Sequence, residues 1–106
     1  MVVNVAMIDT KLRGIYAGML ARLKAGDIEG ALKAFTPSGV EQYRPVFEDL
    51  RLNLFTIADQ LGTIVDGSIM GGLAEYIVVQ DTPTGKQAFL MYFLQGGDGT
   101  WRISQM

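Results

Sequence analysis

Hydrophobic residues recur three or four positions apart in the first sixty residues of the chain, and at alternate positions after that. The first spacing is typical of helices that bury one face, and the second is typical of strands. The longest apolar stripe at helical spacing predicts a first helix that ends at Gly26. Its members are Ile8, Leu12, Ile15, Tyr16, Met19, Leu20 and Leu23. The chain therefore divides into a helical first part and an extended second part.

Three shorter helices are expected after Gly26. Asp27 is a typical N-cap for the second helix, and Thr36-Pro37 stops that helix and starts the third. Pro45 lies inside the third stretch, so we expect a break near Arg44 or a bend there. Asn53 is the expected cap of the fourth helix, which ends before Gly62.

The residues after Gly62 predict a four-stranded sheet. Turn formers separate the alternating segments, so neighbouring strands should pair antiparallel. The expected strands are Thr63–Met70, Leu73–Gln80, Lys86–Gln95 and Thr100–Gln105. The predicted fold class is α+β, with N-terminal helices packed on a four-stranded antiparallel sheet in a single domain over residues 1–106.

The turns also suggest how the strands are paired. A two-residue turn and two symmetric longer turns would pair Met70 with Leu73, Gln80 with Lys86 and Gln95 with Thr100. One sheet face is then almost wholly apolar and should pack on the helices: Val65, Ile69, Ala74, Tyr76, Val78, Ala88, Leu90, Tyr92, Leu94, Trp101 and Ile103.

The second sheet face of this arrangement is mixed, with an apolar cluster at its centre. Four residues make up that cluster: Ile77, Phe89, Met91 and Phe93. An exposed cluster of this kind usually marks a partner surface, so we expect it to be an interface with a second copy or with another domain. The alternative is that the first helix or a terminus covers it.

Composition narrows the classes of chemistry. The chain has no cysteine and no histidine, which excludes thiol nucleophiles, thiolate zinc sites and imidazole bases supplied by this chain. The net charge is −2, so nucleic acid is not expected as a partner. We expect no metal and no cofactor. The apolar segment Met1–Ile8 is short, is interrupted by Asn4 and lacks a basic region, so we expect neither a targeting segment nor membrane insertion.

Two groups of residues are candidates for a site. Asp66, Glu75 and Arg102 share the second face, where two neighbouring carboxylates would form an acid/base pair, or else a solvated polar edge. Four tyrosines and one tryptophan would line a pocket for a small apolar ligand, or else serve as core aromatics with their hydroxyls near the surface: Tyr16, Tyr43, Tyr76, Tyr92 and Trp101.

Several short motifs carry a resemblance that spans nearly the whole chain. They are the stretch from Gly26 to Leu32 with Phe35, then Tyr43 and Phe47, Ala74-Glu75-Tyr76, Gly85-Lys86, Phe93, and Gly99-Thr100-Trp101-Arg102-Ile103. With these residues the chain resembles the small bacterial members of the nuclear-transport-factor-2-like superfamily, whose fold is a cystatin-like α+β cone.

The resemblance implies a strongly bent antiparallel sheet wrapped around helices, often with a pocket at the open end of the cone. It also implies frequent dimerisation through the sheet. Some members are isomerases, dehydratases or epoxide hydrolases, and many are non-catalytic modules, including domains attached to bacterial envelope or secreted proteins.

Three functional hypotheses follow. The first is a non-catalytic binding or assembly module that acts as a homodimer or docks to another domain through a sheet face. The second is a small-ligand pocket protein or a weak isomerase or hydrolase that uses an acid such as Asp66 or Glu75. The third is an accessory domain of a longer bacterial envelope or secreted protein, which the structured-looking ends of the chain would suit.

Overall fold

The computed structural model describes residues 5–106 and confirms the predicted fold class, α+β with helices first and a sheet after. The described elements are α1 (Val5–Lys24), α2 (Ile28–Leu32), α3 (Pro37–Asp49), the 3-10 helix η1 (Arg51–Asn53), α4 (Leu54–Gln60), β1 (Thr63–Met70), β2 (Leu73–Thr82), β3 (Gly85–Gln95) and β4 (Trp101–Gln105). Residues 1–4, and with them half of the segment Met1–Ile8, lie outside the described residues.

The helix caps follow the sequence pattern closely. The Asp27 carboxylate accepts a hydrogen bond from the backbone N–H of Gly30, and the Thr36 hydroxyl accepts one from Gly39. Pro37 occupies the first turn of α3, where its missing N–H costs nothing. α3 continues through Pro45, whose side chain is exposed, so of the two outcomes expected near Arg44, a break or a bend, the break does not occur.

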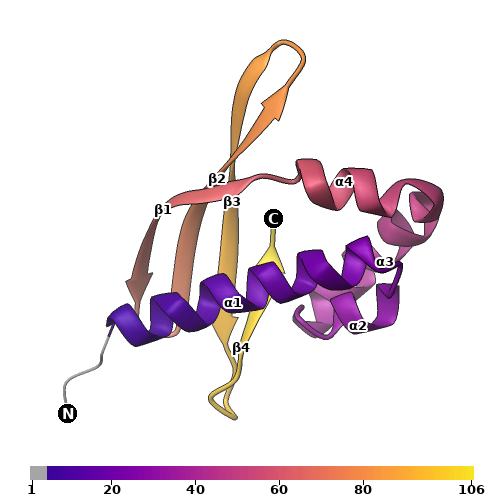
Figure 1. Cartoon of the computed structure of the whole chain (residues 1–106). Helices are drawn as coiled ribbons and strands as arrows, with labels where there is room; N and C mark the ends of the chain where they lie inside the picture. The colour runs from indigo at the N-terminus through magenta and orange to yellow at the C-terminus, as the bar shows by residue number, and fades with distance from the viewer. Residues whose placement is uncertain (1–4) are drawn as a thin grey trace.

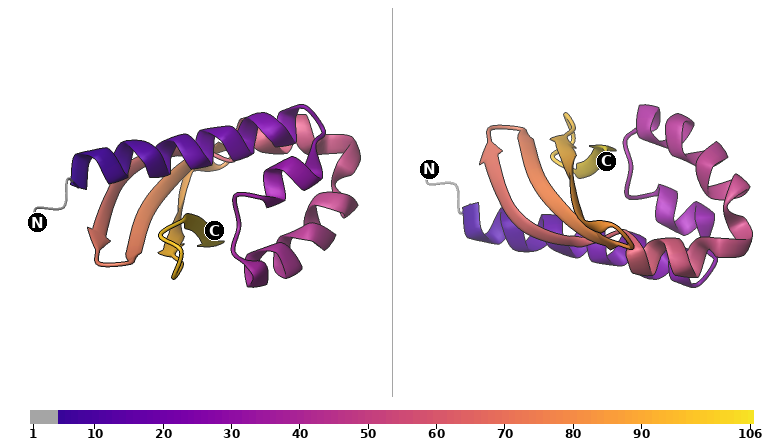
Figure 2. Two further views of the ribbon diagram at one scale, coloured as in Figure 1. Left: turned by 90° about the horizontal axis from the view of Figure 1, so that it is seen from below. Right: turned by 90° about the horizontal axis from the view of Figure 1, so that it is seen from above.

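The four strands form one antiparallel sheet in chain order that does not close into a barrel. α1 crosses one face of the bent sheet, whereas α2, α3 and α4 gather around the C-terminal half of α1 (Figures 1 and 2). Phe35, between α2 and α3, forms a parallel bridge with Ile103 at the outer edge of β4. The β2–β3 hairpin projects beyond the rest of the sheet (Figure 1).

The core lies between α1 and the sheet and continues among the shorter helices. The apolar stripe of α1 is confirmed, since Leu12, Tyr16, Met19 and Leu23 are its buried residues. The largest fully buried side chains are Tyr76, Phe93, Leu12, Met19, Leu23, Met91, Ile103 and Val78. The sheet face that packs on α1 is therefore formed by the even-numbered residues of β2 and the odd-numbered residues of β3.

The predicted pairing of β2 with β3 is wrong by one residue. Met70 pairs with Leu73 as predicted, but Lys86 pairs with Asp81 instead of Gln80. The strands run on to Thr82 and Gly85, so the expected five-residue connection is a tight two-residue turn. A shift of one residue exchanges the two faces of a strand.

The predicted interface cluster is therefore placed wrongly for most of its members. Phe89, Met91 and Phe93 point toward the helices, and Met91 and Phe93 are completely buried. Ile77 remains on the opposite face, half-buried. The side chains of β3 that do share this opposite face are Ala88, Leu90, Tyr92 and Leu94.

Two further irregularities complete the register. The pairing of β1 with β2 shifts between Ile64 and Asp66, so Val65 is 56% exposed instead of packing on the helices. The β3–β4 pairing is also one residue away from the prediction, with Gln95 opposite Trp101. This second slip cancels the first, and Trp101 and Ile103 are buried as predicted.

Candidate functional site

The sheet face opposite α1 has none of the described helices over it (Figures 1 and 2). Leu73 lies opposite Leu94 at the end of this face next to the β1–β2 turn, and Ile77 lies opposite Leu90 four residues further along, with the pair Glu75–Tyr92 between them. Leu73, Leu90 and Leu94 are 42%, 43% and 43% exposed. Met70, which pairs with Leu73 from β1, and the four apolar residues Leu73, Ile77, Leu90 and Leu94 form what we call the sheet patch.

Charged side chains lie both within and beside the sheet patch. Glu75 lies between Leu73 and Ile77 on β2, Asp66 lies on β1 opposite Ile77, and Arg102 lies on β4 opposite Leu94. Glu75 is also the cross-strand partner of Tyr92. Desolvation, followed by the nearby Glu75 carboxylate, raises the pKa of the Tyr92 hydroxyl. The patch thus consists of apolar residues with the Glu75–Tyr92 pair among them and Arg102 on its β4 side.

The candidate acid/base residues do not form one constellation. Asp66 and Glu75 are diagonal neighbours, because Asp66 pairs with Ile77 and Glu75 pairs with Ser68. The Asp66 carboxylate accepts a hydrogen bond from the backbone N–H of Gly67. Arg102 is separated from β2 by the whole of β3 and forms an ion pair with Asp98 at 3.5 Å. Arg102 therefore does not bridge the two carboxylates.

The candidate pocket residues likewise point to separate places. The Tyr16 hydroxyl donates to the carbonyl of Gly62 at 3.0 Å. The Tyr43 hydroxyl accepts from the backbone N–H of Met106 at 2.9 Å and lies 3.2 Å from the carbonyl of the same residue. Trp101 is 4% exposed and belongs to the core. These side chains stabilise contacts between elements and do not converge on one cavity.

The buried Tyr76 makes a polar contact with α1 whose partner the sequence analysis did not predict. The Tyr76 hydroxyl donates to Asp9 Oδ1 at 2.7 Å, and Arg13 contacts the same carboxylate at 3.0 Å. The Arg13 guanidinium also lies 5.8 Å from the centre of the Tyr76 ring. Asp9 precedes Tyr76 by 67 residues, so no local motif joins them; the spacing of Asp9 and Arg13, one helical turn apart, is the available signal.

The pKa values of this cluster oppose a role in proton transfer near neutral pH. The hydrogen bond from Tyr76, more than the neighbouring Arg13, lowers the pKa of Asp9. Desolvation and then the Asp9 carboxylate raise the pKa of Tyr76. Asp9 is thus a weaker base and Tyr76 a weaker acid than usual, whereas proton transfer is fastest for groups whose pKa lies near the working pH. The cluster instead joins α1 to the sheet.

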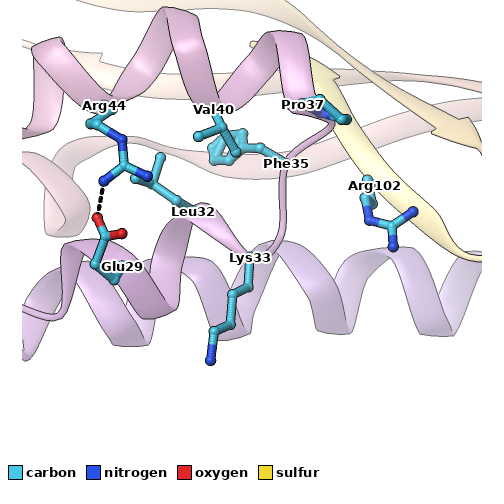
Figure 3. A pocket seen from close by; sticks show the side chains of 8 residues that line it. All are labelled: Glu29, Leu32, Lys33, Phe35, Pro37, Val40, Arg44 and Arg102. Carbon is cyan, nitrogen blue, oxygen red and sulfur yellow. Dashed lines mark hydrogen bonds and ion pairs between the residues drawn. The ribbon is translucent and has the colours of Figure 1, made fainter.

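A second surface feature is a groove of about 660 Å³ between α2, α3 and β4, shown in Figure 3. Glu29 and Arg44 form an ion pair between α2 and α3. Arg44 and Arg102 stand at opposite ends of the groove, with the apolar side chains between them (Figure 3). The lining residues are Glu29, Leu32, Lys33, Phe35, Pro37, Val40, Arg44 and Arg102.

The described residues offer no metal centre, since no three carboxylate, histidine or cysteine side chains among residues 5–106 come close enough to share an ion. In the same range, no helix has the length and apolar character needed to cross a membrane. No protein-family model matches the chain, and a comparison with curated proteins found no match.

Proposed function

We propose that the chain is a non-catalytic assembly module of the nuclear-transport-factor-2-like type, and that two copies associate through their sheet patches. The observation that carries the proposal is the exposure of Leu73, Leu90 and Leu94 on a sheet face that has none of the described helices over it. Where one face of a sheet meets only water, its strands usually alternate strictly between apolar and polar residues, so that the exposed face is mostly polar. Contiguous exposed apolar patches generally mark contact sites.

The size of the sheet supports a second copy as the partner. A stable dimer interface buries about 800 Å² on each partner, roughly an eighth of the 6579 Å² of accessible surface of this chain. The strands β1, β2 and β3 have 8, 10 and 11 residues and extend roughly 26–37 Å, β4 has 5 residues, and the four strands span about 14 Å between the outermost axes. A flat face of this size covers roughly 360–520 Å², so an interface of the usual size would use the whole face and the added area of interdigitating side chains.

The register of the sheet also suits a symmetric pair. In a face-to-face dimer with its two-fold axis along the strands, β4 of one copy lies over β1 of the other, and each residue keeps its level along the strands. Arg102 is level with Leu94, Leu73 and Met70 across the sheet, so Leu73 of one copy would lie over Leu94 of the other, and Arg102 over Met70. Apolar contacts, more than charge pairs, therefore favour this arrangement.

The separation of the polar candidates supports a role without catalysis. Asp66 and Glu75 lack a third partner in Arg102, and the Asp9–Tyr76 pair has pKa shifts in the wrong directions for proton transfer. The tyrosine hydroxyls of Tyr16 and Tyr43 are occupied by backbone groups.

The experiment that tests the proposal replaces two leucines of the sheet patch. The variant with Leu90→Glu and Leu94→Glu should be folded by circular dichroism and monomeric by light scattering under conditions in which the wild type is a dimer, because two carboxylates per copy would be buried without partners. The matched control is Leu52→Glu, at a leucine that is 96% exposed in η1, away from the sheet. A dimer that survives both patch substitutions would refute the proposed interface.

A further inference from the structure

We propose that the groove between α2, α3 and β4 is a binding site for a small amphipathic anion, a molecule with one carboxylate and a short apolar chain. The groove shares no residue with the sheet patch, and Arg102, at the β4 end of the groove, is the cross-strand neighbour of Leu94 in that patch. The proposal concerns a ligand and does not depend on whether the chain forms a dimer.

The shape of the groove is set by the hairpin of α2 and α3 against the edge of β4. The backbone of Thr36 donates to the carbonyl of Ile103, and the backbone of Ile103 donates to that of Ala34. These two bonds hold the segment between the helices against β4 as if it were a short fifth strand. The walls of the groove are therefore fixed by backbone hydrogen bonds as well as by side-chain packing.

The floor of the groove is apolar and rigid. Leu32 and Phe35 are 3% and 2% exposed, and the Phe35 ring packs on Tyr43 at 5.1 Å and on Phe47 at 5.9 Å. Val40, half-buried, lies between Arg44 and Pro37 along the groove (Figure 3). A short aliphatic chain lying on this floor would exclude water from Val40 and Pro37 without displacing the aromatic cluster.

The charge of the lining opposes that of the whole molecule. Lys33, Arg44 and Arg102 contribute +3 and Glu29 contributes −1, so the lining carries +2. The chain as a whole carries −2, so the residues outside the groove sum to −2 − (+2) = −4. A positive groove on a negative molecule concentrates anions at that place and disfavours cations of the same shape.

The cations of the groove are accessible to a ligand carboxylate. Arg44 is paired with Glu29, and Arg102 with Asp98 at 3.5 Å, but all four side chains are at least 35% exposed. Exposed ion pairs of this kind contribute about 0–1 kcal/mol, so a carboxylate can replace one partner at little cost. Lys33 forms no ion pair with any residue in the range 5–106.

The test is a titration of the ¹⁵N-labelled chain, followed by amide chemical shifts, with three probes. Octanoate should shift amides of α2, the start of α3 and β4. Acetate should require a much higher concentration for the same shifts, because it lacks the apolar chain. Octyltrimethylammonium, which has the chain but the opposite charge, should leave the groove unchanged. Equal responses to octanoate and octyltrimethylammonium, or shifts centred on the sheet patch, would overturn the proposal.

A pair of variants separates the groove from general surface charge. Lys33→Gln with Arg44→Gln should weaken octanoate binding by about fivefold or more, the equivalent of about one surface charge contact or more. Lys11→Gln with Arg51→Gln removes the same total charge outside the groove and should leave the affinity unchanged. Neither pair touches the sheet patch, so the dimer is a separate readout. Equal affinities in the two double variants would also refute the assignment.

Discussion

Phe93 and Leu94 are neighbours in β3 that the structure places on opposite faces of the sheet, and this gives a sharp test of the register. Phe93 is completely buried and its ring meets that of Tyr76 edge to face at 5.7 Å. Leu94 is 43% exposed on the sheet patch. The pairing first expected from the sequence would have reversed these environments.

Truncation of each side chain to alanine should therefore have very different costs. Phe93→Ala leaves a cavity between α1 and the sheet and should destabilise the chain by about 3–5 kcal/mol. Leu94→Ala removes a side chain that already contacts water and should cost about 1 kcal/mol. A small domain has about 5–15 kcal/mol of total stability, so the first variant is marginal and the second is not.

Urea unfolding monitored by circular dichroism and by Trp101 fluorescence measures both effects. The urea slope for a chain of this size is about 1–3 kcal/mol/M, so the midpoint of Phe93→Ala should fall by about 1–5 M. The midpoint of Leu94→Ala should fall by less than about 1 M. The measurements belong at a protein concentration where the chain is monomeric, so that loss of an interface does not add to the result. A larger effect at Leu94 than at Phe93 would refute the register of β3.

Two further predictions concern the core. Burial raises the pKa of Tyr16 from its ordinary value of 10 to about 12. The folded chain therefore holds this proton more tightly than the unfolded chain does. The stability that results is fully present below pH 10 and is lost as the pH rises toward 12. The free energy of unfolding of wild type should fall over this window more steeply than that of Tyr16→Phe, and equal slopes would contradict the assignment. A Cβ at Gly67 would lie 2.5 Å from the buried Tyr76 ring, whereas one at Gly18 meets nothing within 4 Å. Gly67→Ala should thus destabilise the chain by about 1–3 kcal/mol and lower its thermal midpoint. Gly18→Ala, inside α1, should stabilise the chain by about 0.5–1 kcal/mol and raise its thermal midpoint. Thermal midpoints that move in the same direction in both variants would contradict the packing described.

The helical part of the chain was the easier part to predict, because its signals are local. Asp27 and Thr36 cap helices through side chains that accept hydrogen bonds from residues three positions later. The cap and the helix it begins are therefore adjacent in the sequence. The apolar stripe of α1 was identified from the sequence because Leu12, Tyr16, Met19 and Leu23 recur at helical spacing. Pro45 was overestimated as a breaker, because the exposed side of a helix leaves the freed carbonyl accessible to water.

The sheet register was not predictable from the pattern, because both faces of β3 are apolar. Phe89, Met91 and Phe93 alternate with Leu90, Tyr92 and Leu94, so either set fits the core equally well by hydrophobicity alone. The choice depends on whether the connection after Gln80 is a five-residue loop or a tight turn, and these differ by one residue in register. Ambiguity of this kind arises wherever a strand has a second apolar face to present.

The candidate surfaces were missed for a related reason. The groove joins residues from Glu29 to Arg102, and the Asp9–Tyr76 contact spans the whole of the helical part. Neither has a local motif, because each depends on how the α2–α3 hairpin and α1 lie against the sheet. Sequence reasoning named Arg102 but placed it with Asp66 and Glu75, whereas the strand order separates them by the full width of β3.

The mass of the wild-type chain in solution, measured by light scattering across a dilution series, tests self-association through the sheet patch most directly. One chain has a mass of 11.6 kDa, so a dimer has 2 × 11.6 = 23.2 kDa. The proposal predicts a mass near the dimer value at high concentration that falls toward the monomer value on dilution. A mass of one chain at the highest concentration that stays soluble would contradict it.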